Sequence, residues 1–191
     1  MTASSELAPG LTAGVWAIDP SHSEISFSVR HLMVSKVRGS FEKFAGTITV
    51  GETAETSSVE ATIEAASINT RDEGRDQHVR SGDFFDVENH PTWTFKATGV
   101  AAGGKGIKIT GDLTLRGVTQ SVVLDTEFLG VNNDPWGNTK AGFSASTTIN
   151  RKDFGIEWNA PLETGGVLVG ESVNIELEIQ AALQQPVTKA I

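Results

Sequence analysis

Cysteine is absent from this chain of 191 residues, and its absence excludes several classes of protein. Disulfides, thiolate metal sites and a cysteine nucleophile are ruled out, and a chain without disulfides fits a reducing compartment. No apolar run is long enough to predict a membrane-spanning helix. Basic residues are few, with 15 Lys and Arg against 24 Asp and Glu, and the net charge is −9. This balance, without a basic block, argues against a nucleic-acid partner, and it disfavours an anionic membrane surface in the same way.

The start of the chain also lacks the features of a secretory signal. The sequence MTASSELAPGLTAG has neither a basic beginning nor an apolar stretch, which predicts a cytoplasmic protein. Hydrophobic residues make up 38% of the chain and charged residues 20%, a balance that is too apolar for a disordered protein. We therefore expect one folded domain over residues 13–183, with flexible tails at 1–12 and 184–191.

Alternation of apolar and polar residues dominates the rest of the chain. In EISFSVR, Ile25, Phe27 and Val29 fall on one face and the polar residues on the other, which is typical of a half-buried strand. The same alternation or a short apolar run recurs at 14–18, 41–50, 59–65, 92–97, 107–115, 118–129, 142–149 and 173–179. Turn residues occur at 101–106, 115–120 and 132–138. The pattern predicts about eight or nine strands in an antiparallel meander.

Two all-β architectures satisfy this pattern. A closed barrel of about eight strands has no exposed edges and leaves an interior that side chains or one small ligand can fill. A two-sheet sandwich with a filled core is the alternative. The apolar faces mix large rings (Phe27, Phe95 and Phe143) with small side chains (Ala61 and Ala145), which suits an interior that is not uniformly packed.

One long segment interrupts the alternation between residues 66 and 91. It predicts a short helix near Glu73 to Arg80, with Thr70 or Asp72 as the N-cap. Long connections in compact domains usually form lids or binding loops. The adjacent Phe84 and Phe85 argue against disorder, because such a pair is expected to pack. We interpret the segment as a cap over one end of the barrel.

The stretch RDQHVRSGDFFD, residues 75–86, combines carboxylates, a histidine and arginines. Acid/base catalysis would use Asp76 with His78, but neither a G-x-S-x-G elbow nor a second catalytic cluster accompanies them. The spacing matches neither an HExxH pair nor a calcium loop. In the third interpretation Arg75, Arg80 and Asp76 pair with one another and with the loop backbone. We therefore predict no catalytic and no metal-ligating residue.

Four blocks in a fixed order are similar to one known family. WAIDPSHSEISFSVRHLMVSKVRGSF, SINTRDEGRDQHVRSGDFFDVENHPTWTF, GDLTLRGVTQ and GFSASTTINRKDFGI resemble the YceI-like family of polyisoprenoid-binding proteins. The resemblance runs from about Trp16 to about Ile179. It implies a lipocalin-like antiparallel barrel, an elongated apolar lumen, and a ligand with a long isoprenoid or other lipid tail. It also implies binding instead of catalysis. Many relatives carry a secretion signal and sit in the periplasm, whereas this chain begins without one.

We therefore expect a single antiparallel eight-stranded lipocalin-like β-barrel with a short helical lid. It would bind, store or transport a polyisoprenoid or related long-chain lipid, such as a prenyl quinone or prenyl pyrophosphate, without any other cofactor. The expected tail contacts are Phe27, Val29, Phe41, Ile63, Phe84, Phe85, Phe95, Leu113, Phe143 and Phe154. The expected head-group rim consists of Arg71, Arg75, His78, Arg80 and Arg151.

Two alternatives differ in class from this carrier. One is a packed β-sandwich that acts as a protein-interaction module without a ligand. The other is a lipid isomerase or cyclase on the same barrel, using Asp76 and His78. The sequence leaves open a homodimer formed through an exposed sheet edge.

Overall fold

The computed structural model describes residues 7–104, 106–163 and 165–185, and these form one antiparallel sheet with a short helix. The strands are β1 (Gly14–Ile18), β2 (Glu24–His31), β3 (Ser35–Phe41), β4 (Phe44–Val50), β5 (Ser58–Glu64), β6 (Ile68–Asn69), β7 (Thr92–Gly103), β8 (Gly106–Leu115), β9 (Val118–Asn133), β10 (Thr139–Asn150) and β11 (Val169–Leu183). The helix is α1 (Glu73–Arg80), and 3-10 turns occupy Pro20–His22, Ala65–Ser67 and Arg151–Phe154.

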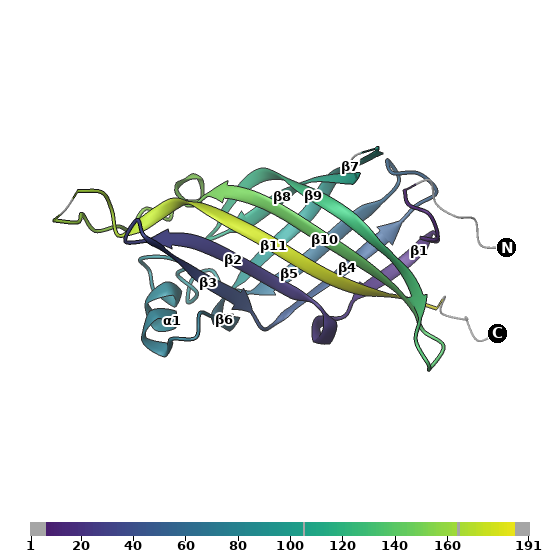
Figure 1. Cartoon of the computed structure of the whole chain (residues 1–191), viewed down its shortest axis with the longest axis horizontal. Helices are drawn as coiled ribbons and strands as arrows, with labels where there is room; N and C mark the ends of the chain where they lie inside the picture. The colour runs from purple at the N-terminus through teal and green to yellow at the C-terminus, as the bar shows by residue number, and fades with distance from the viewer. Residues whose placement is uncertain (1–6, 105, 164, 186–191) are drawn as a thin grey trace.

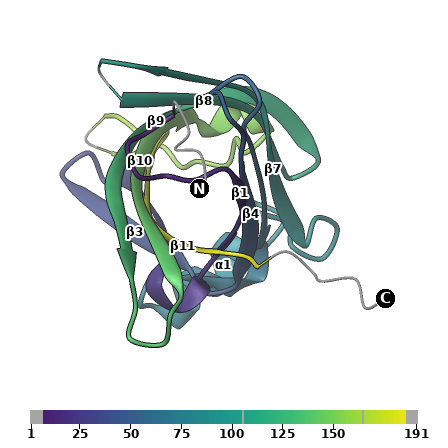
Figure 2. The same ribbon diagram turned by 90° about the vertical axis from the view of Figure 1, so that its right-hand side faces the viewer.

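Eight of the strands close into a ring. The order is β1-β4-β5-β7-β8-β9-β10-β11, and β11 returns to pair with β1. The closing ladder places Trp16 opposite Leu183 and Ile18 opposite Ala181. Viewed along its axis, the ring is continuous (Figure 2). The predicted eight-stranded antiparallel barrel is confirmed, and the two-sheet sandwich is wrong.

The length of β11 allows it to serve two neighbours. Its C-terminal part pairs with β1, whereas its N-terminal part, from Val169 to Glu178, pairs with β2. Strand β3 follows β2 in a hairpin, and the short β6 pairs with the end of β3. These three strands lengthen the wall of the barrel at one end, where α1 also lies (Figure 1).

Strand β3 was not predicted as a separate strand. The apolar run over 41–50 divides at residues 42–43 into the end of β3 and all of β4. The inward positions of β3 are Val37, Gly39 and Phe41. Because glycine has no side chain, the apolar alternation is hidden at the centre of this strand. Gly39 is buried directly opposite Phe27, and a Cβ atom there would lie 2.6 Å from Cζ of that ring.

We predict that Gly39→Ala destabilises the protein by about 1–3 kcal/mol, because the added methyl group displaces the packed Phe27 ring. Urea unfolding measures the change. The matched control is Gly99→Ala, where a Cβ atom meets nothing within 4 Å. Equal stabilities of the two variants would contradict the proposed close packing of ring on backbone.

The barrel end that holds the start of β1 is plugged by apolar side chains. Trp16 and Leu11 are fully buried, and Ala8 is buried beside them. The indole Nε1 of Trp16 donates a hydrogen bond to the carbonyl of Thr12 at 3.1 Å. The prediction of a flexible tail is therefore wrong for residues 7–12, because the apolar side chains of this segment fill the barrel end. Residues 1–6 and 186–191 of the expected tails lie outside the described residues.

The other end carries the predicted helix with the predicted bounds. Asp72, one of the two expected N-caps, accepts a hydrogen bond from the backbone N–H of Arg75 at 2.9 Å. Arg80 donates to the carbonyls of Ala66 and Ile68, which fixes the helix against β6. No helix among the described residues combines the length and apolar character that crossing a bilayer requires.

Candidate functional site

A cavity of about 340 Å³ occupies the interior of the barrel. Alternate residues of β11 line it, namely Val173, Ile175, Leu177 and Ile179, and their neighbours between point outward. The lining is almost entirely apolar. An apolar cavity of about 150 Å³ already holds benzene in another protein, so this one has room for a considerably larger apolar guest. The barrel is therefore not filled by its own side chains.

Nine of the ten predicted tail contacts line this cavity, and the exception is Phe154. The nine are Phe27, Val29, Phe41, Ile63, Phe84, Phe85, Phe95, Leu113 and Phe143. Phe154 is 1% exposed and packs in the core with Ile156 instead. It lies in a 3-10 turn, where the in-and-out alternation of a strand no longer determines the direction of a side chain.

Two aromatic clusters define the α1 end of the cavity. Deeper in the barrel, Trp93 packs edge-on against Phe41 and Phe85, with ring centroids 4.8 and 4.6 Å apart. Nearer the surface, His78 contacts Phe84 at 5.1 Å and Trp158 at 4.8 Å. The Phe pair of the lid thus packs on both clusters, as expected for an ordered cap.

The predicted rim residues divide into two groups. Arg75, His78 and Arg151 border the cavity, whereas Arg71 and Arg80 do not. The guanidinium of Arg80 is directed at backbone carbonyls of the β6 region, and Arg71 is exposed with a left-handed backbone (φ 67°). Neither Arg71 nor Arg80 lines the cavity, and the guanidinium of Arg80 is held by backbone carbonyls instead, so the structure gives no support to a head-group contact by these two residues.

Arg151 holds the loop that follows it. Its guanidinium donates to the carbonyls of Gly170, Ile156, Trp158 and Val169 at 2.7 to 3.2 Å. The side chain is only 4% exposed. Burial lowers the pKa of Arg151, and the nearby Glu171 partly opposes this effect. Its donors are thus committed to backbone groups.

The cavity-lining residues at this end that sequence reasoning missed include His31, Trp158 and Leu168. His31 is the last inward residue of β2, beyond the apolar part of the strand. Trp158 and Leu168 belong to the irregular connection between the Arg151–Phe154 turn and β11. The sequence does show a large aromatic side chain, Trp158, in a loop, but a loop has no periodicity that would place this side chain in a cavity.

The predicted alternative of an Asp76–His78 dyad is wrong. Asp76 is buried and accepts hydrogen bonds from the N–H and hydroxyl of Thr70. His78 Nε2 instead lies 2.9 Å from Asp83 Oδ2, and both side chains are about half exposed. Asp76 therefore ties the lid to the strand before it. Within the described residues, no group of three or more His, Asp or Glu side chains is arranged to hold a metal ion.

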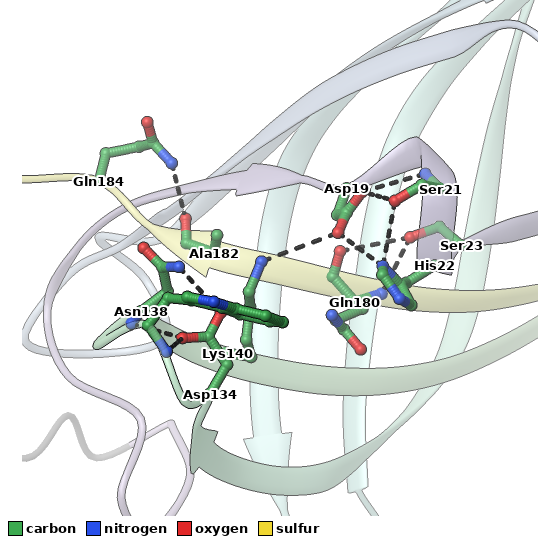
Figure 3. A network of polar contacts seen from close by, with 11 residues as sticks. Asp19, Ser21, His22, Ser23, Asp134, Asn138, Lys140, Gln180, Ala182 and Gln184 are labelled. Atoms are coloured by element: carbon green, nitrogen blue, oxygen red, sulfur yellow. Dashed lines mark hydrogen bonds and ion pairs between the residues drawn. The ribbon is translucent and has the colours of Figure 1, made fainter.

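A second polar cluster lies at the opposite end of the barrel, near the β9–β10 turn (Figure 3). Asp19, Ser21 and His22 have the residue types of a hydrolase triad. However, the Ser21 hydroxyl and the Asp19 carboxylate both contact Nδ1 of His22, at 3.0 and 2.9 Å. A triad requires them on opposite ring nitrogens. The cluster instead caps the Pro20–His22 turn and links it to Lys140 of β10, 3.7 Å from Asp19.

Hydrogen bonds from Ser21 and then His22 lower the pKa of Asp19 from 3.8 to about 2. Because the folded pKa lies below the unfolded one, the stabilisation is complete above about pH 3.8 and is lost as the pH falls through about 2. We predict that Asp19→Asn lowers the free energy of unfolding by about 1–2 kcal/mol at neutral pH, after allowance for screening. Its stability should also decline less between pH 4 and 2.

Urea unfolding at several pH values measures both effects. Glu127→Gln, on the exposed outer face of β9, is the matched control. Parallel pH profiles for Asp19→Asn and the original chain would show that the turn does not depend on the ionised carboxylate.

The fold and the cavity together define a closed antiparallel barrel built around an apolar interior. A model of the YceI-like domain matches residues 16–181, and the chain belongs to this family. UPF0312 proteins from Staphylococcus aureus strains N315 and Mu50 are each 39% identical over 173 residues, which cover 89% of this chain and 98% of theirs. The family resemblance found in the sequence is confirmed.

Solved structures show the same fold. The YceI protein of Campylobacter jejuni has a TM-score of 0.68 and 31% identity, over 82% of this chain and 90% of its own. BcnA of Burkholderia cenocepacia has a TM-score of 0.74 and 24% identity, over 85% and 98%. A polyisoprenoid-binding domain from Saccharophagus degradans has a TM-score of 0.65 and 15% identity, over 88% and 98%. The last two support the fold alone.

Proposed function

We propose that this protein binds a polyisoprenoid or related long-chain lipid in the barrel, as a carrier or store, with no cofactor besides that lipid. The observation that carries the proposal is the apolar cavity, which continues from the plugged end to the lid. The lining residues Val169 and Ile179 are ten positions apart on β11, which is roughly 33 Å along the strand and roughly 25 Å along a typical barrel axis. This length suits a chain better than a compact molecule.

Burial of the chain supplies enough free energy for binding without catalytic groups. Each buried CH₂ contributes about 0.8 kcal/mol, so a five-carbon isoprene unit contributes up to about 4 kcal/mol. Association costs about 4–15 kcal/mol in lost freedom. A few isoprene units therefore offset that cost. The polyisoprenoid-binding domain from Saccharophagus degradans, which shares this fold, is consistent with such a ligand.

The rim favours a neutral head group, such as a quinone, over a pyrophosphate. Arg151 is committed to backbone carbonyls, and Arg75 donates through Nε and Nη2 to Thr70. His78 contacts Asp83. A pyrophosphate requires several free cationic donors, whereas a quinone requires one or two hydrogen-bond donors. Among the described arginines that line the cavity, Arg30 alone has a side chain that is not already hydrogen-bonded, and one free cation falls short of what a pyrophosphate requires. A prenyl quinone should therefore compete more strongly than a prenyl pyrophosphate of equal chain length.

We predict that native mass spectrometry of gently purified protein detects one bound lipid, which solvent extraction then identifies. Ala145→Leu should reduce uptake of a prenyl quinone by tenfold or more, because the larger side chain enters the lumen. Its thermal stability should be unchanged or higher, since filling a cavity stabilises a fold.

The matched control is Ser146→Leu, the adjacent residue on the exposed face of the same strand. It should leave uptake unchanged. A homogeneous protein that neither carries a lipid nor takes up prenyl quinone or prenyl phosphate would overturn the proposal.

A lipid isomerase or cyclase on the same barrel would convert its bound lipid, whereas a carrier would not. We expect the bound lipid to be recovered chemically unchanged after prolonged incubation. His78→Ala should weaken binding by no more than about tenfold, because it removes edge contacts with two rings worth about 0.5–1.5 kcal/mol. Mass spectrometry of the extracted lipid distinguishes the carrier from the enzyme. Conversion that stops in His78→Ala while uptake persists would establish the enzyme.

A further inference from the structure

The turn between β2 and β3 exposes apolar side chains at the cavity end of the barrel. Leu32, Met33 and Val34 are 42%, 54% and 81% exposed, and Val167 across from them is 37% exposed. The turn and the segment before β11 lie at the same end as α1 (Figure 1). Clustered apolar exposure of this kind marks interaction surfaces. We call these four residues the apolar tip.

The tip continues into the cavity. The backbone N–H of Leu32 donates to the carbonyl of Leu168 at 2.9 Å, and Leu168 lines the cavity. Met33 lies close to Gly166, where a Cβ atom would come within 3.3 Å of its Cγ. An apolar surface therefore runs from the outside of the hairpin to the mouth of the lumen, where His31 also lies.

The β2–β3 turn has a left-handed backbone at two positions where the residues are bulky and apolar. Leu32 and Met33 both have left-handed backbones, with φ of 54° and 63°, and the N–H of Val34 donates to the carbonyl of His31. Two consecutive left-handed residues form the hairpin turn that Asn-Gly prefers, and bulky side chains there are strained. Folding alone would favour Asn and Gly, so the apolar side chains point to a role in contact with another surface.

The hairpin is basic, although the protein is acidic. No Asp or Glu occurs between Glu24 and Glu42, whereas Arg30, Lys36 and Arg38 all lie there. Lys36 pairs with Arg30 across the ladder, and Arg38 lies two residues further along the same outer face. All three are exposed. Among the described residues, none of them forms an ion pair with an acidic side chain.

The acidic groups near the hairpin lie on other segments of the chain. On β11, Glu176 and Glu178 lie opposite Ser26 and Glu24, further from the turn. Glu171 is bound to Lys152 at 2.7 Å. Two more acids, Glu157 and Glu163, belong to the loop that faces the hairpin. Because charges are screened beyond about 8–10 Å, the three cations of the hairpin act at short range on a surface that contacts the hairpin itself.

We infer that the β2–β3 hairpin docks the protein on an anionic phospholipid bilayer, with the apolar tip inserted and Arg30, Lys36 and Arg38 on the lipid phosphates. The expectation from net charge, which disfavoured an anionic membrane surface, does not apply to this one face. The inference rests on the proposed function, because docking would serve lipid transfer by placing the mouth of the lumen against the membrane that supplies or receives the lipid.

Sedimentation with vesicles tests the inference. The original chain should bind phosphatidylcholine vesicles that contain one third phosphatidylglycerol, and should bind pure phosphatidylcholine much less. The triple variant Leu32→Asn/Met33→Gly/Val34→Ser should lose at least tenfold in binding while its melting temperature stays equal or rises, because it removes the strain of the turn. Lys36→Gln and Arg38→Gln should each weaken binding to the anionic vesicles by about fivefold.

Trp136→Ser is the matched control, since it removes an aromatic that is 83% exposed in the β9–β10 turn at the other end of the barrel. It should bind vesicles like the original chain. Vesicle binding that is absent in the original chain, or unchanged in the triple variant, would overturn docking by the tip. So would a dimer in vesicle-free solution that the triple variant dissociates, because the tip would then be an interface between two copies.

Uptake of detergent-dispersed prenyl quinone separates this inference from the proposed function. The triple variant should take up the quinone as well as the original chain does. If the original chain takes up the quinone normally but does not bind vesicles, membrane docking is rejected and the lipid carrier is not. Vesicle binding without any uptake would leave docking in place and reject the lipid carrier.

Discussion

Closure of the sheet by the β1–β11 ladder is the constraint on which the rest of the structure depends. Once Trp16 pairs with Leu183, every inward side chain of the ring faces another across a fixed diameter. The inward residues are apolar and of mixed size, and they leave about 340 Å³ unfilled. In an open sheet the same residues would have collapsed onto a second layer, so the cavity is a consequence of closure.

The two ends of the barrel are finished in different ways, and this gives the cavity a direction. Trp16 and Leu11 fill one end with tightly buried apolar side chains. The other end is covered by α1 and the lid, whose outer part is fastened by polar contacts such as His78 with Asp83 and Arg80 with Ala66. Polar contacts at a surface exchange with water more readily than a buried indole moves. Entry and exit of a ligand are therefore expected at the α1 end.

Charge is distributed in accordance with this direction. The protein as a whole is acidic, yet the hairpin beside the mouth has three cations and no acid between Glu24 and Glu42. The strongly lowered pKa of Asp19, by contrast, belongs to a structural turn at the plugged end. A uniform property such as net charge thus describes solubility, whereas the local arrangement at the mouth determines which surfaces the protein can approach.

The sequence by itself determined the all-β class, most strand positions, the helix from Glu73 to Arg80, and nine of the ten side chains predicted to line the cavity. These follow from local rules, because a period of two sets which face each strand residue occupies. Only the tertiary structure decided where residues outside that period point. Phe154 is buried in the core. Arg80 and Arg151 donate hydrogen bonds to backbone carbonyls. Trp158 lines the mouth of the cavity from a loop. Direction in turns and loops depends on contacts between segments far apart in the chain, and no local pattern in the sequence encodes those contacts.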